Sequence, residues 1–172
     1  MLMSLTANHF ELFNLPASFD IDKNELANRY RELQRAVHPD KYANASDRER
    51  RLALQKTAQI NEAFQTLKNS LTRGQYLLQL QDIDVNDAND TTMDNLFLME
   101  QMELREEMAE ISHFEALNDF LNRMEQKMQN LDKTLSQQFA NNDFVAAKDS
   151  VRKYQFFRKL HEEALVLEER FM

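Results

Sequence analysis

The tripeptide His38-Pro39-Asp40 places an imidazole and a carboxylate on either side of a proline. An Asp that orients a His can make it a general base, and the same pair, left exposed, can hydrogen-bond to another protein. Proline fixes φ at about −65°, which would hold both side chains in a rigid loop. These residue types therefore leave two functions open, catalysis and protein recognition.

The segments that flank the tripeptide decide where it lies. Both are amphipathic and basic, and each begins with a capping-box pattern, a Ser or Asp followed three residues later by Glu. These patterns, at Asp22-x-x-Glu25 and Ser46-x-x-Glu49, predict helices over residues 23–37 and 47–68. The tripeptide is therefore expected at the exposed tip of a helical hairpin.

The composition predicts an all-α fold. One Gly and two Pro occur among 172 residues, and the abundant Leu, Ala, Glu, Gln and Met favour helix. A capping box at Ser112-x-x-Glu115 and a stop at Asn141-Asn142-Asp143 set two later boundaries. Beyond the hairpin, helices are expected over residues 8–14, 71–80, 95–111, 114–140 and 144–170. Short connections between the last three favour an antiparallel three-helix bundle.

Residues 82–90 are rich in Asp and Asn, which compete for backbone hydrogen bonds and disfavour helix. We therefore expect a flexible linker over residues 81–93, between a first module (1–80) and a second (94–172). An EF-hand loop that began at Asp82 would need Gly and Glu where Asp87 and Met93 stand, so calcium binding is not expected.

Several classes of function are excluded by what the sequence lacks. Without Cys there is no disulfide, thiolate metal site or cysteine nucleophile. No apolar run is long enough to span a bilayer, and the first residues do not resemble a signal peptide. A cytoplasmic protein with no membrane partner is therefore expected.

The charge is unevenly distributed. The net charge is −8, yet residues 23–56 carry nine Lys or Arg against five acids, while residues 82–119 carry twelve acids and the single Arg105. Such asymmetry indicates two surfaces that attract different partners, although solvated helix faces would also account for much of it. A dedicated nucleic-acid site is not expected in a chain this acidic with no recognised motif.

Catalysis by the tripeptide would require a pocket that excludes water, and a hairpin tip is not expected to provide one. The other histidines, His9, His113 and His161, show no metal-ligand spacing. We therefore expect no enzymatic activity, metal or cofactor, and protein recognition becomes the favoured function.

A second candidate surface lies on the predicted helix over residues 95–111. At about 100° per residue, one stripe should face the core: Phe97, Gln101, Leu104, Met108 and Ile111. A different side combines apolar and acidic residues: Leu98, Met99, Met102, Glu103, Glu106 and Glu110. An apolar cluster rimmed by acids indicates a partner site, unless a wide apolar stripe packs against both neighbouring helices.

The last predicted helix carries a related signal. A core stripe is expected from residues spaced by three or four: Phe157, Leu160, Ala164, Leu167 and Phe171. Phe156 lies about 100° from Phe157 and cannot share the centre of that stripe.

The first module resembles a J-domain. The matching segments are Phe10-Glu11-Leu12-Phe13-Asn14-Leu15-Pro16, the basic helix with Arg29, Tyr30, Leu33 and Arg35, the loop His38-Pro39-Asp40-Lys41, and Ile60-Asn61-Glu62-Ala63-Phe64-x-x-Leu67. Placement of the tripeptide between two capped helices makes a chance match improbable.

The whole chain resembles the bacterial iron–sulfur co-chaperone family HscB. The further matching segments are Arg73-Gly74-Gln75-Tyr76-Leu77-Leu78, Phe97-Leu98-Met99-Glu100-Gln101-Met102-Glu103-Leu104-Arg105-Glu106-Glu107 and Val151-Arg152-Lys153. Gly74 departs from the alanine expected in the family, and a mid-helix Gly costs about 1 kcal/mol. The N-terminal cysteine pairs of some eukaryotic relatives are absent, which favours the bacterial form.

The resemblance implies a two-module, L-like protein that brings an iron–sulfur scaffold protein (IscU type) to a DnaK-type ATPase chaperone (HscA type) and stimulates its ATPase, assisting iron–sulfur cluster assembly and transfer. The implied chaperone-binding residues are Arg29, Arg35, His38, Pro39, Asp40 and Lys41. The implied scaffold-binding residues are Leu98, Met99, Met102, Glu103, Glu106, Glu110 and Phe156. The alternatives are a general J-protein that delivers unfolded polypeptides to a DnaK-type chaperone and, more remotely, a purely structural helical protein.

Overall fold

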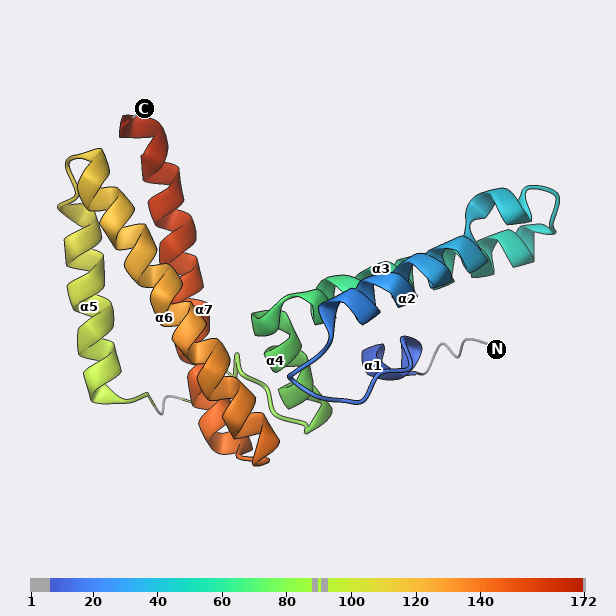
Figure 1. The fold of residues 1–172 in the computed structure, drawn as a ribbon, viewed down its shortest axis with the longest axis horizontal. Helices are drawn as coiled ribbons and strands as arrows, with labels where there is room; N and C mark the ends of the chain where they lie inside the picture. The colour runs from blue at the N-terminus through green and yellow to red at the C-terminus, as the bar shows by residue number, and fades with distance from the viewer. Residues whose placement is uncertain (1–6, 88–89, 91–92, 172) are drawn as a thin grey trace. The chain divides into compact units, whose positions relative to one another are not determined.

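The computed structural model describes residues 7–87, 90 and 93–171. All regular elements of these residues are helical, as the composition predicts (Figure 1). The chain divides into two compact units, Met1–Leu77 and Leu78–Met172. None of the helices in the described part is long and apolar enough to cross a membrane.

The first unit is built on a pair of long antiparallel helices joined at an exposed tip (Figure 1). Its elements are α1 (His9–Leu12), α2 (Lys23–Val37), the 3-10 turn η1 (Pro39–Tyr42), α3 (Asp47–Lys68) and the start of α4 (Ser70–Leu80). The two predicted N-caps are confirmed: Asp22 accepts the backbone N–H of Asn24 and Glu25, and Ser46 accepts that of Glu49. Each cap fixes a helix start, and Ser46 thereby also fixes where the connecting tip ends.

The long helices are tied together partway along the hairpin. The Tyr30 ring stacks on Phe64 with 3.9 Å between centroids. The Tyr30 hydroxyl donates to Asn61 Oδ1 at 2.7 Å and accepts from Gln34 Nε2 at 2.7 Å. Nearer the tip, Val37 is only 6% exposed. The tip therefore projects from a hairpin that is packed along its length.

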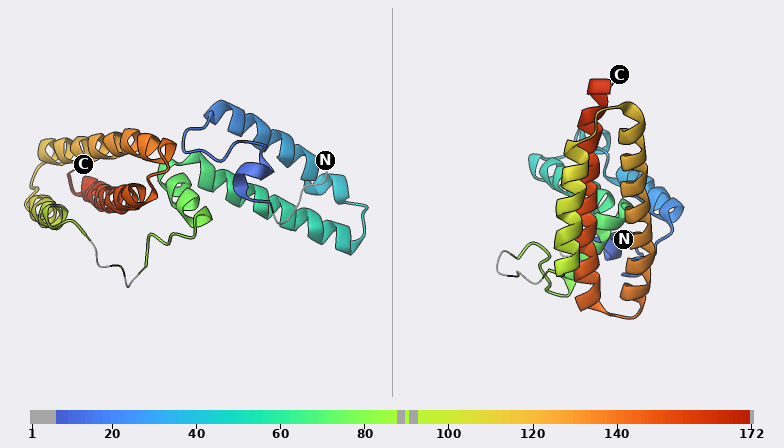
Figure 2. Two further views of the ribbon diagram at one scale, coloured as in Figure 1. Left: turned by 90° about the horizontal axis from the view of Figure 1, so that it is seen from below. Right: turned by 90° about the vertical axis from the view of Figure 1, so that its left-hand side faces the viewer.

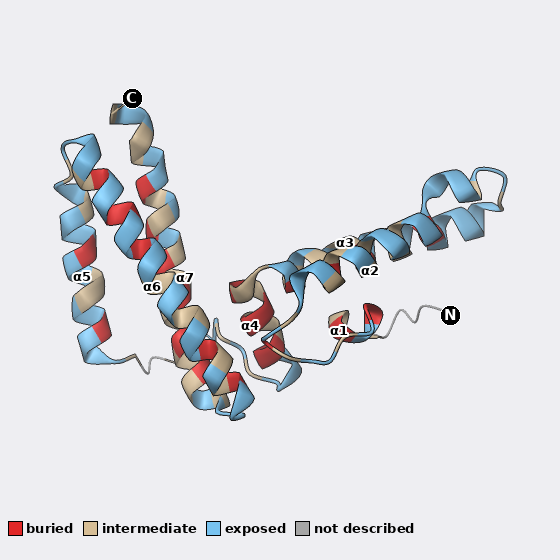
Figure 3. Ribbon diagram, in the orientation of Figure 1, coloured by how far each residue is buried: buried red, intermediate tan, exposed pale blue. Residues whose placement is uncertain are grey.

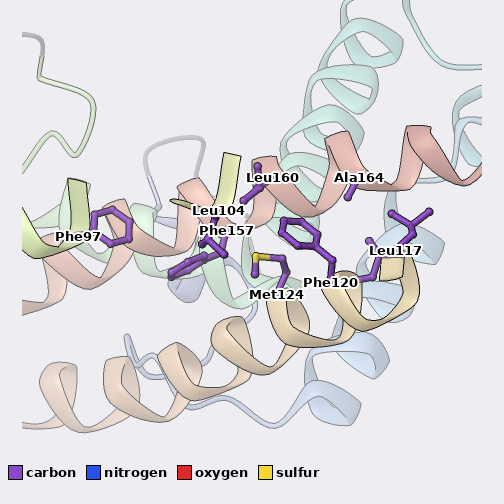
Figure 4. Packing of buried hydrophobic residues seen from close by; sticks show 9 residues of the cluster. Phe97, Leu104, Leu117, Phe120, Met124, Phe157, Leu160 and Ala164 are labelled. Carbon is purple, nitrogen blue, oxygen red and sulfur yellow. The ribbon is translucent and has the colours of Figure 1, made fainter. Parts of the chain in front are cut away.

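The second unit is a three-helix bundle, as expected. It contains α5 (Asn95–Ala109), α6 (Phe114–Ala140) and α7 (Phe144–Leu167), followed by the 3-10 turn η2 (Glu168–Phe171). The two longest helices, α6 and α7, form an antiparallel hairpin with α5 beside it (Figure 2). Its core contains Phe97, Leu104, Leu117, Phe120, Leu121, Met124, Phe157, Leu160 and Ala164 (Figure 4).

Several boundaries differ from the prediction; helix α5, for example, ends at Ala109 rather than at residue 111. Helix α6 is capped by His113 rather than Ser112, because His113 is extended and its Nδ1 accepts the Ala116 N–H at 3.2 Å. Helix α1 ends earlier than residue 14, since Asn14 adopts a left-handed φ of 54°. Helix α7 ends at Leu167, and η2 continues from there.

The connection between the units was expected to be a flexible spacer, but Asp90 within it is bonded to the bundle. Its carboxylate forms ion pairs with Lys148 and Arg152 of α7, and its carbonyl accepts from Arg152 Nη2 at 3.4 Å. The Asp90 side chain is only 18% exposed. This residue is therefore fastened to the bundle.

Candidate partner-binding sites

The His38-Pro39-Asp40 tip is held by its own backbone. His38 follows α2 and caps η1: its Nδ1 accepts the Asp40 N–H at 3.2 Å, and its carbonyl accepts the Lys41 N–H at 3.0 Å. Pro39 is the first residue of η1, where its missing N–H costs nothing. These contacts lie within four residues, so local sequence determines the loop.

The exposed tip suits recognition better than catalysis. Its His38 and Asp40 side chains are 57% and 92% exposed, and the ribbon between α2 and α3 is coloured mainly as exposed (Figure 3). Because Nδ1 accepts a backbone N–H, the neutral His38 ring carries its proton on Nε2. The Asp40 carboxylate lies 3.5 Å from that ring and can accept charge-assisted hydrogen bonds from a cation on a partner.

A groove lies beside the tip, but it is open and is not the water-excluding pocket that catalysis would require. An open groove of about 380 Å³ lies between α2 and α3 and extends to His38 and Pro39. Its surface is mainly apolar, and it is lined by Arg31, Gln34, Arg35, Val37, His38, Pro39, Thr57 and Ile60. None of the described residues that line the groove is a carboxylate, so the groove lacks the acid–base pair that the catalytic hypothesis required.

Arg29 supports the fold, although the resemblance implied a chaperone-binding role. Its guanidinium donates to the carbonyls of Phe13 (2.7 Å) and Asn14, and it also pairs with Glu25. These bonds fasten the loop after α1 to α2. The charge of Arg29 is therefore used within the protein.

The remaining basic residues near the tip are available to a partner. Arg35 and Lys41 are exposed, and neither forms an ion pair with any residue in the described ranges. Arg31, which the resemblance did not assign, lines the same groove as Arg35. The structure thus brings Arg31, Arg35 and His38 together.

The apolar and acidic face of α5 is exposed, opposite the buried Phe97 and Leu104. Leu98, Met99 and Met102 are 43%, 57% and 65% exposed. The acidic residues of this face, Glu103, Glu106 and Glu110, are also exposed. The alternative in which this stripe packs against a second helix is therefore wrong.

Phe156 lies where α7 meets α5. It is partly buried and packs edge-on against Phe97 at 5.6 Å. The guanidinium of Arg105 lies 5.5 Å from the Phe156 ring and pairs with Glu163 at 3.1 Å. Arg105 follows Leu98 by seven residues, two helical turns, on the same side of α5. The structure therefore places Phe156 beside Phe97 and Arg105 of α5.

A helical hairpin with an exposed His-Pro-Asp tip defines the chain as a J-domain protein. The DnaJ domain profile matches residues 8–76. A second profile, described as the HSCB C-terminal oligomerisation domain, matches residues 93–165. The chain belongs to the HscB co-chaperone family.

Similar proteins match nearly the whole chain. The HscB homologue of Shewanella amazonensis is 44% identical over 167 residues, covering 91% of this chain and 94% of the relative. The homologue of Photobacterium profundum is 46% identical, covering 95% and 98%. Both are named co-chaperones.

Two solved structures have the same fold. HscB from Vibrio cholerae matches with a TM-score of 0.83 at 40% identity, covering 96% of this chain and all (100%) of that one. The human co-chaperone HscB matches with a TM-score of 0.91 at 32% identity, covering 96% and 84%.

Proposed function

We propose that this chain is an adaptor in iron–sulfur cluster assembly and transfer. It binds an IscU-type scaffold protein, brings it to an HscA-type, DnaK-like chaperone in the cytoplasm, and stimulates the ATPase of that chaperone. It hydrolyses no ATP itself and requires no cofactor.

The observation that carries this proposal is that the two units expose surfaces of opposite character. The tip presents His38 and Asp40 near the exposed cations Arg35 and Lys41. The α5 face presents exposed Leu and Met side chains among carboxylates. Surfaces this different recognise different partners, as an adaptor requires.

At the chaperone, Pro39 holds the loop and Asp40 accepts hydrogen bonds from a cation of the partner. Arg35 and Lys41 attract acidic groups around the docking site and accelerate association. At the scaffold, Leu98, Met99, Met102 and Phe156 supply the apolar contact, with Met packing adaptably. Glu103, Glu106 and Glu110 lie at the rim of this apolar contact and select basic groups of the scaffold.

The alternative, a general J-protein, makes a different prediction about clients. An adaptor for a folded scaffold should bind it at one small defined face, whereas a holdase should bind many extended chains. Calorimetric titration of the full chain with the folded scaffold protein and with a reduced, alkylated unfolded protein distinguishes the two. Saturable one-site binding to the scaffold alone is expected; tighter binding to the unfolded protein would favour the general J-protein.

A further inference from the structure

The segment between α4 and α5 follows one face of α7. Gln155 Nε2 donates to Asn86 Oδ1 at 3.4 Å. The Asp90 carboxylate pairs with Lys148 Nζ at 2.5 Å and with Arg152 Nη1 at 3.7 Å. Positions 148, 152 and 155 are spaced by four and three, so their side chains share one stripe of the helix. We call the described residues that lie against this stripe, residues 85–87, 90 and 93, the strap.

Asp90 is the main attachment of the strap. One carboxylate faces two cations, and the side chains of Asp90, Lys148 and Arg152 are only 18%, 22% and 18% exposed. Water and salt therefore screen these pairs less than they screen pairs on the surface. The Asp90 carbonyl also accepts from Arg152 Nη2 at 3.4 Å. Both the side chain and the backbone of Asp90 are thus bonded to α7.

The strap also forms one side of a hollow beside Phe156. This hollow is open and measures about 370 Å³; Val85 and Met93 of the strap line it together with Phe156 and other residues of α7. Met93 and Phe156 pack against the same core cluster, which includes Phe97. Phe156 belongs to the proposed scaffold contact, so a scaffold side chain that reaches it through the hollow also touches the strap.

We propose that the bound scaffold protein stabilises the docked strap: an apolar side chain of the scaffold enters the hollow and contacts Phe156 on one side and the strap on the other. The inference rests on the proposed function and adds a route from the client site to the segment that leads to the J-domain. Two observations favour this occupant. The hollow and the proposed scaffold face share Phe156, and Val85, Met93 and Phe156 offer it apolar contact.

Thermodynamic linkage determines what such a contact does. A ligand shifts an equilibrium only by its difference in affinity for the two states. A scaffold side chain that touches the docked strap therefore favours docking, and release of the strap lowers the scaffold affinity by the same factor. Because a single side chain makes the contact, a factor of about five is expected, at the low end of measured couplings.

Docking of the strap also shortens the tether between the J-domain and the bundle. Helix α4 ends at Leu80 and α5 begins at Asn95. A strap held at Asp90 leaves residues 81–89 as the tether, whereas a released strap leaves residues 81–94. The effective concentration of tethered partners falls roughly as the −3/2 power of tether length. The docked strap should therefore raise the effective concentration of a tip-bound chaperone around the bound scaffold about twofold.

The first test is solvent exchange of the Asn86 and Asp90 amides, measured by NMR in the labelled full chain with and without a purified IscU-type scaffold protein. These amides donate to Asp84 Oδ1 at 2.9 Å and to the Asp87 carbonyl at 3.1 Å. The scaffold should slow the exchange of both. In the free chain, Asp90→Asn should accelerate both about tenfold, the effect of losing a charge-assisted hydrogen bond.

Asp82→Asn is the matched control. It removes the same charge from the same segment, at an exposed residue that forms no ion pair within the described ranges. The left-handed φ of 59° at this position also suits Asn. This variant should leave the exchange of both strap amides unchanged.

The second test is the ATPase rate of a purified HscA-type chaperone at saturating scaffold, where a change in scaffold affinity has no effect. Asp90→Asn should keep the stimulation by the chain alone and reduce the scaffold-dependent excess about twofold, because the tether is longer. Gln155→Ala removes the bond to Asn86 without changing the charge, and it should act in the same direction with a smaller effect. A purely structural role of Asp90 would lower thermal stability and leave the excess unchanged.

The outcomes separate this inference from the function on which it rests. If the unmodified chain does not bind the scaffold, the proposed function fails. If the scaffold binds but the exchange of the Asn86 and Asp90 amides is unchanged, the scaffold does not stabilise the strap and the inference is refuted. Faster strap exchange in folded Asp90→Asn or Gln155→Ala, with scaffold affinity and ATPase excess both equal to those of Asp82→Asn, would also refute it.

Discussion

The tip of the first unit and the α5 face of the second are both exposed, but they are positioned by different forces. The tip is fixed by a proline and by hydrogen bonds within four residues. The α5 face is positioned by core packing of Phe97 and Leu104 and by ion pairs with the neighbouring helices, such as Lys127 with Glu100 at 2.7 Å. A local structure survives changes elsewhere in the unit, whereas a packed face depends on the whole bundle.

This difference predicts that stimulation of the chaperone ATPase and binding of the scaffold protein, the two proposed functions, can be lost separately. The largest effect is expected from Asp40→Asn, which keeps the size of the side chain and removes its charge. Losing a charge-assisted hydrogen bond should reduce chaperone ATPase stimulation by roughly 10- to 100-fold, while helicity and scaffold binding stay unchanged. Unaltered stimulation would remove the tip from the mechanism.

The next effect concerns the second unit. Combined Ala substitutions at Leu98, Met102 and Phe156 should weaken scaffold binding by roughly 100-fold, because central apolar contacts contribute about 1 kcal/mol or more each. Stimulation of the ATPase without scaffold should not change. The matched control truncates three exposed apolar residues of the same bundle, Val145, Leu165 and Val166. Equal losses in the two triple variants would show that the α5 face is not specific.

A smaller effect separates two arginines of α2. Arg29→Ala removes bonds to two loop carbonyls and should lower the free energy of unfolding of the first unit by about 1–3 kcal/mol, with normal stimulation by the folded fraction. Arg35→Ala should leave stability unchanged and raise the half-stimulating concentration up to about fivefold, as for an exposed charge pair. Chemical denaturation and ATPase titration of both variants measure these effects. A loss of stability in Arg35→Ala and a loss of stimulation in folded Arg29→Ala would instead assign Arg35 to the fold and Arg29 to chaperone binding.

The smallest effect is a pH dependence of the first unit. Burial lowers the pKa of His9 from its ordinary 6.5, and the nearby Glu62 partly opposes the change. The folded state therefore disfavours protonation of His9, whose ring stacks on Tyr76 at 4.2 Å between centroids. This contribution to stability is complete above about pH 6.5 and is lost as the pH falls through the lowered pKa. Denaturation at several pH values should show a shallower loss for His9→Gln than for the unmodified chain; identical slopes would contradict it.

The sequence predicted well what depends on short-range signals. The starts of α2, α3 and α7 follow from Asp22, Ser46 and Asp143, each of which accepts a backbone N–H of the first turn. Helical periodicity correctly separated the buried Phe97 and Leu104 from the exposed residues of α5. His113 was missed as a cap because Ser is the commoner N-cap residue.

Tertiary contacts were not predictable from the same signals. Arg29 donates to carbonyls of a loop 15 and 16 residues earlier. Every residue has a backbone carbonyl, so residue types cannot indicate which carbonyls accept these bonds. Asp90 meets partners 58 and 62 residues later in the chain, so its composition indicated only a linker. The groove at Val37 and Ile60 requires two packed helices, although the cationic pair Arg31 and Arg35, one turn apart on α2, was a signal that could have been used.

If this chain couples two partners, the coupling should be visible in the ATPase rate of a purified HscA-type chaperone. The rate is measured alone, with this chain, with the IscU-type scaffold protein, and with both. Both together should raise the rate well above the sum of the separate increases, and the triple Ala variant at Leu98, Met102 and Phe156 should lose this excess. Merely additive stimulation would contradict the coupling.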